Sequence, residues 1–189
     1  MKKLLAIIIL SSYFLTSSQA DGIKDFEIEG VSIGDSLLSY VNKSEINNNL
    51  AKYYKDNEYS SFLIFKDKGT IELKDYDHMV LSFKTNDNNF KIEAISGIIF
   101  YKEKISQCYK DMNGVIKEIS NIINISPTKI KKIKSQHGYN TFSRFNFSKG
   151  NIAVSCTDYD SKYPNYVDHM RITNDTNEFE NWLHLKAYK

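Results

Sequence analysis

The stretch ISQCYKDMNGVIKEISNII, residues 105–123, carries the strongest periodic pattern in this sequence of 189 residues. Its apolar residues recur at intervals of three and four, which is the spacing of one face of an α-helix. They are Ile105, Cys108, Tyr109, Met112, Val115, Ile116, Ile119, Ile122 and Ile123. Pro127 follows and cannot continue a helix. The pattern predicts an amphipathic helix over residues 103–124, with one side lying on a sheet.

Strand-like segments flank this helix, three on each side. They are residues 60–66, 79–84 and 90–101 before it, and 141–147, 151–157 and 166–173 after it. Two short helices are expected at 36–41 and 42–50, and a last helix, capped by Asp175, at the end of the chain. Strands in hairpin-like succession with helices between them predict an α+β domain rather than a doubly wound parallel sheet.

The expected fold is therefore an antiparallel sheet of about six strands, covered on one side by helices. The order is a helix pair, three strands, a helix, three strands and a helix. An αβββ unit occurs twice in this order. The halves do not align residue by residue, so a duplication stays open.

Residues 1–20 have the features of a secretory signal peptide: two lysines, a short apolar run and a Ser-Gln-Ala ending. No other segment has the roughly 18 apolar residues of a membrane-spanning helix. We expect residues 21–189 to be one exported domain, periplasmic or secreted and not membrane-spanning. Abundant Lys, Asn and Ile indicate a bacterial source with an AT-rich genome.

Without Lys2 and Lys3 the chain carries 23 basic and 23 acidic residues, so it has no net field that would attract nucleic acid. The lysines of residues 129–134 alternate with isoleucine. This pattern suits a solvated strand or loop edge. An anionic surface as partner is the sharper alternative.

Cys108 and Cys156 both occupy core-facing positions, one on the helical period and one on the two-residue strand period. In an exported chain this predicts a disulfide between them, worth about 4 kcal/mol in the chain-entropy model. The alternative is two buried free thiols. A catalytic cysteine is disfavoured, because an apolar surrounding suppresses the thiolate.

The letters Gly34-Asp35-Ser36-Leu37 resemble the first block of the GDSL hydrolases, whose serine is a nucleophile. That family also needs a downstream Gly and Asn and a late Asp-x-x-His, and here the Asp-x-x-His match comes early, at Asp75–His78. A serine becomes a nucleophile only beside a positioned base. Ser36 is therefore interpreted as a helix cap.

The segment 158–166 contains Tyr159, Tyr163 and Tyr166, which are candidates for an aromatic binding surface for a sugar or peptide. The alternative is a tyrosine-rich turn that packs on the sheet. A calcium loop is disfavoured, since its sixth position lacks glycine and its twelfth lacks glutamate. The four histidines lie in separate segments, so no metal site and no cofactor are expected.

Two stretches, DFEIEGVSIGDSLLSY at 25–40 and ISGIIFYKEKISQCYKDMNGVIKEIS at 95–120, resemble a family of small exported proteins of unknown function from AT-rich marine alphaproteobacteria. A looser likeness, at the level of a helix pair followed by three strands, is to periplasmic modules of the BamE and β-lactamase-inhibitor-protein type. This resemblance implies binding of other proteins, by analogy of fold alone.

These observations favour an exported, non-enzymatic binding or interaction module, with a protein or envelope component as its partner. A secreted esterase that uses Ser36 is the alternative function.

Overall fold

The computed structural model describes residues 22–189 except residues 52, 69–70 and 103. The expected signal peptide, residues 1–20, lies outside the described residues. The expected domain, residues 21–189, begins one residue before them.

The described residues form eight strands, three α-helices and one 3₁₀ turn. The first half contains the 3₁₀ turn Leu37–Ser39, α1 (Lys43–Asn48), β1 (Leu50–Ala51), β2 (Tyr59–Phe65), β3 (His78–Lys84) and β4 (Ile92–Phe100). The second half contains α2 (Ile105–Ile123), β5 (Lys131–Ser135), β6 (Gly138–Asn146), β7 (Gly150–Tyr159), β8 (His169–Thr176) and α3 (Asn177–Leu185).

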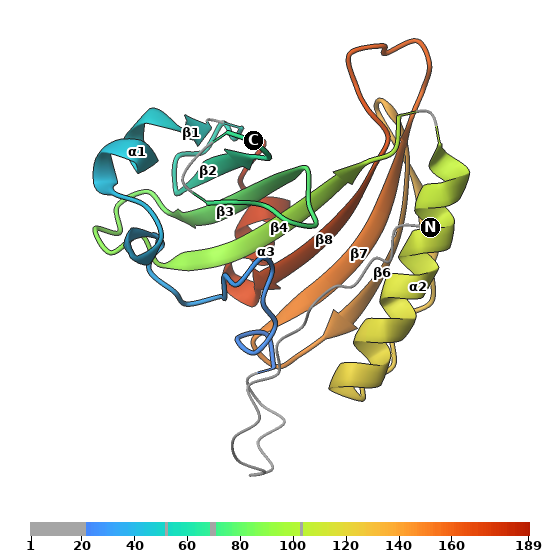
Figure 1. Cartoon of the computed structure of the whole chain (residues 1–189), viewed down its shortest axis with the longest axis horizontal. Helices are drawn as coiled ribbons and strands as arrows, with labels where there is room; N and C mark the ends of the chain where they lie inside the picture. The colour runs from blue at the N-terminus through green and yellow to red at the C-terminus, as the bar shows by residue number, and fades with distance from the viewer. Residues whose placement is uncertain (1–21, 52, 69–70, 103) are drawn as a thin grey trace.

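All eight strands belong to one antiparallel sheet in the order β1-β2-β3-β4-β8-β7-β6-β5. Each half is thus a helix followed by a four-stranded meander, and the halves meet where β4 pairs with β8 (Figure 1). The sheet is strongly curved, and the connection between β7 and β8 extends beyond its end.

The predicted fold class is wrong in the number of strands and in the placement of the helices. β1 has only two residues, too few for a periodic signal. β5 is an edge strand whose five side chains are all exposed, so it lacks the apolar alternation of a half-buried strand. The helices also do not share one side of the sheet, because α2 and α3 pack on opposite faces.

Two of the helix ends show how local chemistry sets the element bounds. Asn42 caps α1 by accepting a 2.9 Å hydrogen bond from the backbone N–H of Glu45. Thr176 caps α3, and its hydroxyl accepts a 3.2 Å hydrogen bond from the backbone N–H of Phe179. The predicted cap at Asp175 is therefore wrong by one residue, because β8 continues through Asp175 and places its side chain on a face of the sheet.

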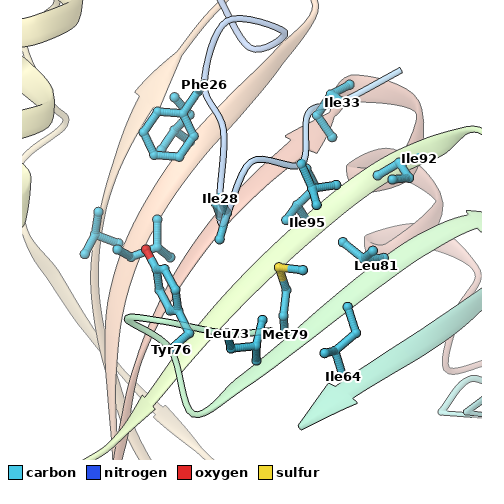
Figure 2. Close-up of a cluster of buried hydrophobic side chains, with 14 of the residues drawn as sticks. Phe26, Ile28, Ile33, Ile64, Leu73, Tyr76, Met79, Leu81, Ile92 and Ile95 are labelled. Atoms are coloured by element: carbon cyan, nitrogen blue, oxygen red, sulfur yellow. The ribbon is translucent and has the colours of Figure 1, made fainter. Parts of the chain in front are cut away.

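We call one side of the sheet the core face; it carries Ile95, Ile152 and Ile172, which belong to the main hydrophobic cluster. Two segments cover this face. α2 lies over β7 and β8, and the irregular segment 23–41 lies over the other half of the sheet (Figure 1). Figure 2 shows Ile28 of that segment close to Ile95 of β4 and Met79 of β3.

α2 contacts the core face through the stripe that the sequence predicts. Met112, Ile116 and Ile119 are buried, and Ile105 and Tyr109 pack at the margin of the cluster. Asn124 ends the helix in the left-handed conformation, at φ 54°.

The predicted disulfide is confirmed in the structure. Cys108 of α2 and Cys156 of β7 are bonded, with an Sγ–Sγ distance of 1.99 Å and a Cα–Cα distance of 6.1 Å. Both cysteines are fully buried, so the bond ties α2 to the sheet inside the core.

We call the opposite side the pocket face; its β8 residues are His169, Arg171, Thr173 and Asp175. α3 covers only one end of it, where Phe179 and Trp182 pack on Tyr59 and Ala94 in a separate hydrophobic cluster. The rest of this face stays open.

Candidate binding pocket on the open face of the sheet

A cavity of about 800 Å³ occupies the open part of the pocket face. This volume lies within the usual range of small-molecule sites. Side chains from β3, β4 and β8 form its floor, and residues from β7, α3 and three connecting or terminal segments form its walls.

The cavity is deep at its centre because the side chains of the central floor residues are small. Val80, Ser96 and Thr173 lie opposite one another on β3, β4 and β8, and Ser82 and Ala94 are paired in the next row. Side chains of this size leave unfilled a space that leucine or phenylalanine would occupy. The cavity is therefore a direct consequence of the residue sizes along three strands.

Aromatic rings form walls around this floor. The lining rings outside the floor strands are Tyr53, Tyr54, Tyr159, Tyr166, Phe179 and Tyr188. Ring contacts hold some of these side chains in place. Tyr54 meets Trp182 edge-on, with 4.7 Å between ring centroids, and the centroid of Tyr159 lies 4.9 Å from that of Tyr166. Tyrosine supplies apolar area with a polar tip, which suits contact with an amphipathic ligand.

One end of the floor is formed by a cross-strand row that consists of His78, Ile98 and Arg171. His169 precedes Arg171 by two residues and therefore projects from the same side of β8. His78 stacks on Phe65, with 4.4 Å between ring centroids. His169 Nδ1 lies 3.0 Å from the Val167 carbonyl oxygen, an acceptor that requires the proton on Nδ1.

Arg171 has no hydrogen-bond or ion-pair partner for its guanidinium within the part of the chain that the structure describes. Its Nε is buried and unpaired, and the same holds for Nε2 of His78. Native proteins satisfy most buried polar atoms, so such atoms beside a cavity call for an explanation. A bound ligand is one explanation.

Both histidines are electrically neutral at pH 7. Burial, with smaller contributions from the nearby Arg171 and His169, lowers the pKa of His78 to about 4. Burial also lowers the pKa of His169 to about 4, with Arg171 contributing, against the opposing effect of the hydrogen bond to Val167. Arg171 is thus the permanent positive charge at this end of the pocket.

Asp175 lies at the opposite end of the floor, beside α3. Burial and, to a smaller extent, the charge of Glu180 raise the pKa of Asp175 to about 7, against the opposing effect of the charges of Arg171 and Arg144 and of a hydrogen bond with Thr173. Glu180 itself accepts hydrogen bonds from Arg144 and, at 2.9 Å, from Asn151 Nδ2. The pocket therefore has a cationic end at Arg171 and an end at Asp175 that is only partly ionised near pH 7.

The structure brings the predicted tyrosines together. Tyr159 and Tyr166 line the pocket, whereas Tyr163 is not among the lining residues and instead contacts Tyr166 at 6.0 Å between centroids. His137 joins the group by stacking on Tyr166 at 4.9 Å. Tyr159 and Tyr166 therefore form one wall of the cavity, and Tyr163 and His137 pack against Tyr166.

Ser36 lies at the start of the 3₁₀ turn. Its hydroxyl donates a 2.6 Å hydrogen bond to the Asn89 carbonyl and accepts a 3.3 Å bond from the Leu38 N–H. No histidine among the described residues is hydrogen-bonded to it. This is the geometry of a helix cap, and it does not support a role of Ser36 as a nucleophile.

Arg171, His169 and His78 were missed by reasoning from the sequence. A usable signal was present in residues 169–175, where the odd positions are His, Arg, Thr and Asp and most even positions are apolar. That alternation indicates a strand with one polar face. The neighbours on β3 and β4, which complete the pocket, cannot be read from it.

A second hollow, of about 360 Å³, lies on the core-face side and has an acidic lining that includes Glu27, Glu72 and Glu118. The Glu29 carboxylate there accepts hydrogen bonds from the backbone N–H groups of residues 74, 75 and 76, at 2.7–3.2 Å. Its role is to hold that loop.

The lysines of residues 129–134 lie on or next to the exposed edge strand β5.

No family model, curated protein or solved structure matches this chain. The resemblance to exported proteins of marine alphaproteobacteria, and the likeness to BamE-type and inhibitor-type modules, therefore stay predictions. Among the described residues, no helix combines the length and the apolarity needed to cross a membrane.

Proposed function

We propose that this protein is an exported, non-enzymatic binding module whose ligand site is the cavity on the pocket face. The observation that carries the proposal is the guanidinium of Arg171, unpaired among the described residues, at the end of an aromatic-walled cavity of about 800 Å³. A cavity of this size favours a small molecule over the protein or envelope component that the sequence suggests.

The two histidines of the pocket favour binding over turnover, whereas Asp175, with a pKa of about 7, meets the pKa condition for a general base. An efficient general base has a pKa near the working pH. The pKa values of His78 and His169, both about 4, make these imidazoles weak bases at pH 7. The disulfide supports an oxidising compartment, periplasmic or extracellular.

A fragment screen by two-dimensional amide NMR on residues 21–189 tests the proposal. The library contains anionic, neutral and cationic fragments in equal numbers. We expect hits to shift the amide signals of β4 and β8 around Ser96 and Thr173. The substitution Ser96→Trp fills the middle of the floor and should abolish these shifts.

Ser39→Trp is the matched control, because it adds the same side chain at an exposed serine of the 3₁₀ turn, in the segment that covers the core face, and Ser39 is not part of the pocket lining. Both variants are first checked for a dispersed spectrum and a cooperative thermal transition. The proposal fails if no fragment of any charge shifts the pocket signals, or if the shifts are the same in Ser96→Trp as in the unaltered protein.

A further inference from the structure

The pocket contains one permanent positive charge, and no carboxylate among the described residues forms an ion pair or hydrogen bond with it, although Asp175 further along β8 interacts with it through charge. Arg171 lines the cavity without a carboxylate partner. Its positive charge acts on the pKa values of residues from several segments, among them Tyr53, Tyr159 and His78. A partly buried guanidinium without a direct ion pair is costly, and an anionic ligand at this end of the pocket would reduce that cost.

The guanidinium also restricts which anion fits. Its planar set of N–H donors matches a carboxylate through two parallel hydrogen bonds. The neighbouring histidines add no positive charge at pH 7, so one negative group is enough to neutralise this end of the pocket. Asp175 and Glu180 at the far end would repel a second negative group.

The distance along β8 sets the shape of the remaining ligand. Arg171 and Asp175 are four residues apart, which is about 13 Å along a strand. Between them the ligand meets the small floor residues Ser96 and Thr173, with the tyrosine rings at the sides. This surrounding suits an apolar or aromatic body.

We propose that the pocket binds a small organic monocarboxylic acid, with its carboxylate on Arg171 and its apolar body above Ser96 between the tyrosine walls. This inference rests on the proposed function and adds the chemical class of the ligand.

The test compares three probes with one carbon skeleton: 3-phenylpropionate, 3-phenylpropanamide and 3-phenylpropylamine. Affinities are measured at pH 7 by calorimetry, and amide NMR locates each bound probe. We expect the acid to bind at least about tenfold more tightly than the amide, as a charge-assisted pair with arginine implies. The amine should not bind in the pocket.

Arg171→Gln should remove the preference for the acid over the amide, and Arg171→Lys should restore part of it. Lys162→Gln is the matched control: it removes an exposed positive charge from the loop after β7, at a residue that is not part of the pocket lining. That variant should bind the acid as tightly as the unaltered protein.

The comparison of acid and amide uses the unaltered protein, so it stands even where a variant does not fold. Three results would each overturn the inference. The unaltered protein binds the acid and the amide with equal affinity, or Arg171→Gln binds the acid as tightly as the unaltered protein. In the third, the acid shifts only the signals of the lysines of β5. The binding function would survive all three results if neutral fragments still shift the pocket signals. Failure of every fragment at the pocket removes both proposals.

Discussion

The two faces of the sheet are formed by the same strands, but one is covered and the other is largely open. On the core face, α2 and the segment 23–41 cover the side chains, and the apolar cluster and the disulfide exclude water. On the pocket face, α3 covers one end only, and the remainder is a cavity between small floor residues and aromatic walls.

β8 shows the contrast within one strand. Met170 and Ile172 are buried in the main cluster, while Arg171 and Thr173 line the cavity. Asn174, on the core face, donates hydrogen bonds to the carbonyl groups of Ile23 at 2.6 Å and Phe26 at 3.1 Å. Even the polar group on the core face thus serves packing, since it holds the covering segment in place. We infer that the core face supplies stability and the pocket face supplies recognition.

The largest expected effect on stability comes from the disulfide of the core face. Replacing both Cys108 and Cys156 by alanine should lower the free energy of unfolding by about 4 kcal/mol, because the bond closes a loop across 48 residues. Urea unfolding of the oxidised protein and the double variant measures the difference.

Reduction with dithiothreitol is the internal control for this prediction. It should destabilise the unaltered protein and leave the double variant unchanged. Two titratable thiols in the folded, air-oxidised protein would contradict the pairing.

A matched pair of leucines compares the faces directly. Leu81 of β3 is fully buried on the core face, and Leu63 of β2 is half-buried on the other side. Leu81→Ala should cost about 3 kcal/mol, as cavity-forming substitutions in a core do, and Leu63→Ala about 1 kcal/mol or less. Chemical denaturation measures both costs, and equal costs would break the distinction between the faces.

The smallest expected effect is the pH dependence that the pocket face confers. The pKa values of His78 and His169 lie near 4 in the folded protein and near 6.5 when unfolded, so the unfolded chain takes up protons first. Each histidine therefore lowers stability as the pH falls from about 6.5 to 4, by about 1 kcal/mol between pH 7 and 4.5 once solvent screening at the open pocket is allowed for. The variants His78→Gln and His169→Gln should each lose about that much less on acidification.

Asp175 acts in the opposite sense. Its pKa is raised to about 7, so the folded state holds the proton more tightly and stability rises as the pH falls from 7 toward 4. The free energy of unfolding of Asp175→Asn should therefore fall more steeply on acidification than that of the unaltered protein. Thermal melts at pH 4.5 and pH 7 separate the two contributions, and parallel pH profiles for all four proteins would contradict both assignments.

Reasoning from the sequence located the elements with strong periodicity. The helix 103–124 corresponds to α2, and each of the six expected strands overlaps an observed one. Cys108 and Cys156 could be paired because each lies on a clear period in its own segment. β1 was not counted because it has only two residues. β5 overlaps the stretch 129–134, which was interpreted as a solvated strand or loop edge and not counted in the sheet, because all its side chains are exposed and it has no buried side.

The pocket was largely beyond the reach of the sequence. Tyr159 and Tyr166 stood out as a local cluster and do line the cavity. His78 and Ser96 come from the consecutive strands β3 and β4, and Arg171 comes from β8, much later in the chain. None of the three stands out within its own segment. They meet because β3, β4 and β8 are neighbours in the sheet, an order that depends on the pairing of the last strands of the two meanders.

The sequence by itself determined which side of each periodic element is apolar, where α2 ends and which cysteines share the interior. These properties depend on neighbours within a few residues, or on a period that repeats along one segment. Only the tertiary structure decided that β4 pairs with β8, that α3 crosses to the other face, and that Arg171 has no ion pair among the described residues. Those properties depend on which distant segments come into contact, and strand pairing is a property of the whole sheet rather than of any one strand.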